Sequence, residues 1–103
     1  MHGSIFVVDL PKEKLEMHGL LNRYKPGMTL KVECISRDSL PPANLTFYVN
    51  REPAQPQHLW HRVAGGHNGT LWTSFLTIQF VIQKHHFIGG RIKIRCVSDI
   101  YSI

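Results

Sequence analysis

Residues 29–36 read TLKVECIS, and residues 91–97 read RIKIRCV. In both stretches apolar residues alternate with polar or charged ones, which is the pattern of a strand that has one face in a core and the other in solvent. The alternation places Cys34 and Cys96 on the inward faces of two strands that lie about 60 residues apart in the chain. This separation excludes a C-x-x-C redox pair and a compact zinc knuckle. We therefore predict one long-range disulfide between the two strands.

Two further alternating stretches lie between the cysteines, and the first has Phe47 at its centre. Two inward cysteines on separate strands, with an inward aromatic residue about 13 positions after the first, are typical of the inter-sheet disulfide and core aromatic of an immunoglobulin (Ig) domain. We predict an all-β, Ig-like β-sandwich. Its strands B, C, E and F are expected at residues 29–36, 45–50, 74–82 and 91–97.

Two positions depart from the usual Ig pattern. Phe47 stands where tryptophan is common, and Ile94 stands where a corner tyrosine is expected. Both residues can still fill inward positions, so a C2-like domain fits better than a variable-type one. Residues 53–70 contain several Pro and Gly breaks and predict loops with one or two short edge strands, and residues 83–90 predict a crossing turn.

Composition limits the chain to one folded domain. It has 103 residues, of which 43% are hydrophobic and 18% charged, as in ordinary globular domains. No apolar run approaches the ~20 residues of a membrane helix. The formal net charge is +5, but the basic residues are scattered and no nucleic-acid-binding motif occurs. We expect neither a membrane span in this chain nor a nucleic-acid partner.

Several short stretches together resemble a known family. They are residues 24–27 (YKPG), 30–34, 39–42, 44–50, 76–80 and 86–96. Their succession, from about Leu15 to Ile100, resembles the second Ig domain of the insect beaten path proteins. The resemblance implies a neuronal protein, secreted or anchored to the plasma membrane, that acts in axon guidance and cell adhesion by binding Sidestep-like Ig receptors. It also implies that the preceding domain holds the main receptor contact, so it assigns no binding residue here.

The two ends of the chain do not match a whole Ig domain. Residues 1–10 read like the last strand of a preceding Ig domain plus a linker, and residues 11–103 like an Ig-like domain truncated before strand G. We expect the edge of strand F to lack its neighbour and the monomer to be marginal. Residues 5–8 could fold back into part of that place, or a second copy could pair there.

Two sequons are consistent with an extracellular glycoprotein. Asn44-Leu45-Thr46 and Asn68-Gly69-Thr70 both match the acceptor pattern. Asn68, in a Gly-rich loop, is the better acceptor, whereas Asn44 adjoins strand C and could be partly shielded.

The seven histidines raise the question of a metal site. The candidates are His58, His61, His67, His85 and His86. Adjacent histidines on an extended chain point to opposite sides, and no nearby cysteine or acidic pair completes a ligand set. We expect solvated loop histidines and no metal. The sequence also lacks a G-x-S-x-G elbow, a phosphate-binding Gly loop and an H-E-x-x-H motif, so we expect neither an enzyme nor a cofactor.

Arg91, Lys93 and Arg95 form a basic stripe on the outward face of strand F, close to Tyr48 and Asn50 if strand C pairs beside it. This face is a candidate contact for an acidic protein or a sulfated glycan. Charges on an exposed sheet face also serve solubility, and we favour that interpretation.

The leading functional hypothesis is an extracellular recognition module of a multi-domain neuronal protein. The alternative is a glycan-binding or structural spacer Ig domain. An intracellular muscle-type Ig domain is a third hypothesis, and it would have reduced cysteines and unused sequons.

Overall fold

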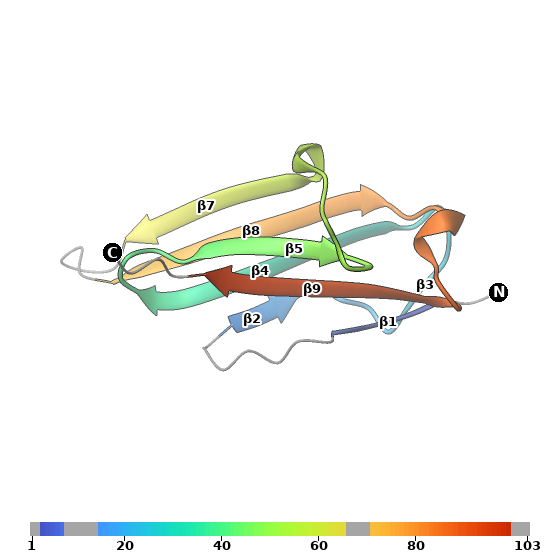
Figure 1. The fold of residues 1–103 in the computed structure, drawn as a ribbon, viewed down its shortest axis with the longest axis horizontal. Coiled ribbons are helices and arrows are strands. Elements are labelled where there is room, and N and C mark those ends of the chain that lie inside the picture. Colours follow the sequence, from blue (N-terminus) through green and yellow to red (C-terminus); the bar gives the residue numbers. More distant parts are fainter. Residues whose placement is uncertain (1–2, 8–14, 66–70, 100–103) are drawn as a thin grey trace.

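The computed structural model describes residues 15–65 and 71–99, and the backbone alone of residues 3–7. The strands are β1 (Gly3–Val7), β2 (Leu15–His18), β3 (Arg23–Tyr24), β4 (Thr29–Ser39), β5 (Asn44–Val49), β6 (Glu52–Pro53), β7 (Leu59–Gly65), β8 (Trp72–Val81) and β9 (Arg91–Asp99). Two short 3-10 helices are η1 (Pro56–His58) and η3 (Lys84–His86). The strands form two sheets, in the orders β3-β1-β9-β5-β6 and β2-β4-β8-β7, and one sheet lies over the other (Figure 1).

A disulfide joins the two sheets through the core. The sulfur atoms of Cys34 on β4 and Cys96 on β9 are 2.07 Å apart. Phe47 on β5 lies opposite Cys96 in the register and is fully buried. The predicted disulfide and core aromatic are confirmed, and the chain is an Ig-like β-sandwich in which β4, β5, β8 and β9 are strands B, C, E and F.

The inward residues of these four strands form the core because their alternation has the period of a strand. The buried cluster includes Leu30, Val32, Leu76, Ile78, Phe80, Ile92 and Ile94. All of them were predicted to face inward. The observed strands extend one to three residues beyond several predicted ends, a difference that is usual at element boundaries.

One strand is longer than the sequence predicted. Residues 53–70 were expected to be loops with one or two short edge strands. The edge strand β7 is found there, and it pairs with β8 in antiparallel register over seven residues, from Leu59 opposite Ile78 to Gly65 opposite Trp72. As an edge strand, β7 exposes residues on both of its faces, including Trp60 and Val63. Its sequence therefore carries no inward–outward alternation by which it could be recognised.

Strand β1 occupies the position beside β9 where strand G of an Ig domain would lie. It pairs in parallel with β9, from Ser4 opposite Arg91 to Val7 opposite Ile94, and in antiparallel register with β3. The first of the two ways predicted for covering the edge of strand F is therefore confirmed over these residues, because the amino-terminal segment folds back beside β9. Residue 8 lies outside the described residues, and the assignment of residues 1–10 to a preceding domain stays a prediction.

Tyr24 belongs to β3 and to the core, where the residue is 1% exposed. Its hydroxyl accepts a hydrogen bond from the Leu21 N–H at 3.0 Å and donates one to the Gly19 carbonyl at 3.4 Å. The side chain thus holds the β2–β3 connection against the sandwich.

Candidate functional site

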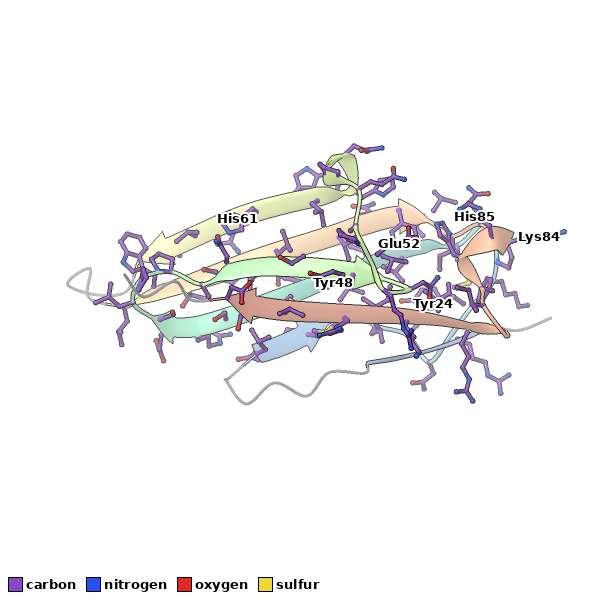
Figure 2. All side chains as sticks on the ribbon, in the orientation of Figure 1. Tyr24, Tyr48, Glu52, His61, Lys84 and His85 are labelled. Atoms are coloured by element: carbon purple, nitrogen blue, oxygen red, sulfur yellow. A yellow bond between two sulfur atoms is a disulfide. The ribbon has the colours of Figure 1, made fainter. Side chains whose placement is uncertain are left out.

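The outward face of β9 and β5 carries the residues that the sequence singled out. Arg91 and Arg95 are exposed, and Lys93 is half-buried. Tyr48 on β5 lies opposite Arg95 in the register (Figure 2). The Arg95 guanidinium carbon lies 5.6 Å from the centroid of the Tyr48 ring, which is within the range of a cation–π contact. The predicted neighbourhood of Tyr48 and the basic stripe is confirmed, with Lys93 less exposed than its neighbours.

A tight turn joins β5 to β6 at one end of this face. Its two central residues, Asn50 and Arg51, have φ angles of +51° and +73°, as the type I′ turns of two-residue hairpins require. Asparagine adopts this conformation readily, but at the second position glycine is preferred and arginine is strained. The turn therefore presents an exposed arginine from a backbone position that favours glycine.

The Asn50 side chain fastens this turn to two other segments. Its Nδ2 donates to the His86 carbonyl at 2.7 Å, and its Oδ1 accepts from the Lys93 N–H at 3.0 Å. The Asn50 N–H donates in turn to the Lys93 carbonyl at 3.0 Å. Three hydrogen bonds thus hold the β5–β6 turn against β9 and η3.

A second tight turn leads into β9 from the other side. Gly89 and Gly90 have φ angles of +60° and +77°. The N–H of Ile88 donates to the Arg91 carbonyl at 2.8 Å, and the N–H of Arg91 donates to the Ile88 carbonyl at 3.1 Å. Glycine makes this turn possible because both positions need the left-handed conformation. It places Ile88, 65% exposed, next to the first residue of β9.

The two turns and the start of β9 enclose a hollow of about 290 Å³. It is lined by Asn50, Arg51, Ile88, Arg91 and Lys93. Three of the five residues carry a positive charge and one supplies an amide, while most of the surface that lines the hollow is apolar. This arrangement suits an anion that also has an apolar face.

The opposite sheet carries an acidic residue that forms two ion pairs. Glu16 on β2, in the opposite sheet, pairs with Arg37 at 2.7 Å and with His18 at 3.0 Å. The hydrogen bond from Arg37 lowers the pKa of the Glu16 carboxyl, with a smaller effect from His18. Glu52, next to Arg51 in sequence, is exposed on β6.

The histidines do not lie as predicted. His85 and His86 were expected to point apart, but their ring centroids are 4.2 Å apart, because they sit in η3 and not in an extended chain. His86 also packs edge-on to Phe80, on which His58 stacks. Within the described residues no three His, Cys, Asp or Glu side chains are grouped closely enough to hold a metal ion.

His61 lies on β7, far from the η3 cluster (Figure 2), and His67 lies outside the described residues. Burial lowers the pKa of His86, and the neighbouring His85 and His58 lower it further. Its Nδ1 accepts a hydrogen bond from the Gln83 N–H at 2.8 Å. The η3 histidines therefore form a packed aromatic cluster in which His86 favours the neutral form.

Of the two sequons, one can be placed. Asn44 is the exposed first residue of β5, opposite Asp99, so the shielding considered for it is not found. Asn68 lies outside the described residues.

The sequence did not identify Arg51 or Ile88 as members of the site. Strand C was predicted to end at residue 50, and Gly89-Gly90 lies within the predicted turn, but nothing local shows that the two turns meet. An Asn at the first position of a two-residue turn was the available signal, since it predicts positive φ for the residue after it.

None of the helices in the described ranges has the length and apolar character needed to cross a membrane. Comparison with protein-family models, with curated proteins and with solved structures finds no match for this chain. The resemblance to the beaten path family therefore stays a prediction.

Proposed function

We propose that this chain is an extracellular recognition module that binds a protein partner through the outward face of β5 and β9. The observation that carries the proposal is the contact between Arg95 and Tyr48 on that face. Tyrosine and arginine are the residue types most enriched among the energetic centres of protein interfaces. The sheet holds both in place, so little conformational entropy is lost on binding.

The disulfide supports the extracellular setting. Disulfides persist in secreted and cell-surface proteins and are rare in the reducing cytosol. The exposed sequon at Asn44 is compatible with the same setting. Within the proposal, the chain acts by surface complementarity and has no catalytic role.

The resemblance to the beaten path proteins names the partner class, and the contact proposed here adds to the main receptor contact that the resemblance places in the preceding domain. On that basis we propose a Sidestep-like Ig receptor on a neuronal surface, and a role in axon guidance and cell adhesion. The protein would be secreted or anchored to the plasma membrane.

The test is binding of the secreted chain to a panel of Sidestep-like ectodomains by biolayer interferometry. Arg95→Ser should weaken binding about tenfold or more, as truncation of an interface centre does. Arg62→Ser is the matched control: Arg62 on β7, in the other sheet, also lies over an aromatic ring, 3.8 Å from the Phe75 centroid. It should change affinity less than about twofold. The proposal would be refuted if the chain bound no ectodomain, or if both variants lost the same affinity. Either result would favour a spacer domain.

A further inference from the structure

We propose that the hollow between the β5–β6 turn and the β9 turn binds one sulfated sugar unit of a linear sulfated polysaccharide. The inference goes beyond the proposed protein recognition, which uses the middle of the face, and it rests only on the extracellular setting. Its residues are Asn50, Arg51, Ile88, Arg91 and Lys93. Neither the turns nor the hollow is part of the Tyr48–Arg95 contact.

The backbone of the turn that carries Arg51 is fixed before any ligand arrives. Arg51 extends from a residue with a φ of +73°, and the hydrogen bonds of Asn50 anchor this turn to β9 and η3. Strained backbone at a surface turn commonly marks a functional position. Arginine also matches sulfate with two parallel hydrogen bonds, as it does carboxylate and phosphate.

The size and lining of the hollow favour a sugar. Its volume of about 290 Å³ lies just below the roughly 300–1,000 Å³ of pockets for drug-sized ligands, as a ligand smaller than a drug requires. A single sugar unit has polar groups for Asn50 and Arg51 and a C–H face for the exposed Ile88. Polar groups that fix orientation beside an apolar wall are the usual composition of a small-ligand site.

The start of β9 favours a linear polyanion over an acidic protein at this end of the face. Arg91 and Lys93 are alternate residues on β9, so their Cα atoms lie roughly 6.6–6.8 Å apart. Successive sulfates of one chain can therefore contact both residues. The centre of a protein interface is more apolar, and of the large apolar side chains exposed in the described residues only Ile88 lines the hollow.

Arg51→Gly separates binding from folding. It removes one positive charge and gives the turn the residue that its φ angle prefers, so the thermal midpoint should stay equal or rise. Lys31→Gln is the matched control, because Lys31 is exposed on β4 in the other sheet and its loss changes the net charge equally. The probe is a fluorescein-labelled heparin hexasaccharide, followed by anisotropy at several NaCl concentrations.

We expect Arg51→Gly to weaken heparin binding about tenfold, and the slope of log affinity against log salt to fall by about one, as for the loss of one contact to a polyanion. Lys31→Gln should bind within about twofold of the unchanged protein. If both variants lost the same affinity for the hexasaccharide, the proposed site would be wrong, because binding would then follow net charge alone.

Two further arms identify the ligand and separate this proposal from the first. A polyglutamate peptide of matched charge is the second probe. If it binds as tightly as the hexasaccharide and its affinity falls as much in Arg51→Gly, the site belongs to acidic proteins and the glycan assignment is wrong. Arg51→Gly should leave receptor binding unchanged, whereas Arg95→Ser should weaken it. The two variants therefore test the two proposals independently, so that either proposal can fail while the other holds.

Discussion

At the residue scale, His86 shows how packing turns a surface histidine into a pH-dependent group. Its ring lies against Phe80 and within 4.2 Å of the His85 ring, centroid to centroid. Its Nδ1 must be unprotonated to accept the hydrogen bond from Gln83. Burial and the two nearby histidines lower its pKa in the folded chain.

The sign of the pH dependence follows from that direction. The unfolded chain has the ordinary histidine pKa of about 6.5, so just below this pH it binds the proton more readily than the folded chain. The contribution of neutral His86 to the stability of the folded chain is therefore complete above about pH 6.5. It is lost as the pH falls through 6.5 towards the lower pKa that His86 has in the folded chain. We expect the thermal midpoint to decrease between pH 7.5 and 5, and to decrease less in His86→Gln.

Differential scanning fluorimetry across that pH range measures the effect. His61→Gln is the control, since His61 is exposed on β7, and it should follow the unchanged protein. A pH dependence in His86→Gln as steep as in the unchanged protein would show that His86 does not contribute.

At the element scale, β1 is the feature that departs most from an ordinary Ig sandwich. It runs parallel to β9, whereas a strand G that follows strand F through a hairpin must run antiparallel to it. Its backbone nevertheless covers the edge of β9 from Arg91 to Ile94. An uncovered strand edge presents unpaired N–H and C=O groups and invites pairing with another chain.

Deletion of residues 1–10 should therefore lower the thermal midpoint and cause association. We expect the shortened chain to melt several degrees lower, because about 1 kcal/mol shifts the midpoint of a domain of this size by roughly 4–8 °C. Size-exclusion chromatography and melts at two protein concentrations report both effects. Deletion of residues 1–2 alone leaves β1 whole and serves as the control. A monomer that melts as the full chain does would mean that β1 contributes nothing to stability.

At the scale of the whole molecule, one covalent bond links the two sheets. Cys34 and Cys96 are 62 residues apart in sequence and both are buried. In the chain-entropy model, a cross-link that closes a loop of this length stabilises the fold by roughly 4 kcal/mol. This is a large fraction of the roughly 5–15 kcal/mol that typically separates a folded domain from its unfolded state.

The double variant Cys34→Ala, Cys96→Ala should accordingly lose about 4 kcal/mol of unfolding free energy. Urea denaturation followed by tryptophan fluorescence measures the difference. If the loss is below about 1 kcal/mol, the unfolded chain gains little entropy when the cross-link is removed.

The sequence by itself determined the parts of this protein that depend on local periodicity. Alternation over a few residues is enough to predict β4, β5, β8 and β9, the inward Phe47 and the disulfide, because side chains on a strand change face at every residue. The same rule placed Tyr48 beside the basic stripe. The tertiary structure alone decided which segments meet: β1 lies beside β9, Arg51 and Ile88 line the same hollow, and the rings of His85 and His86 come together in η3. These contacts join turns and edges, where no repeating pattern exists and where geometry depends on the packing of the whole sandwich.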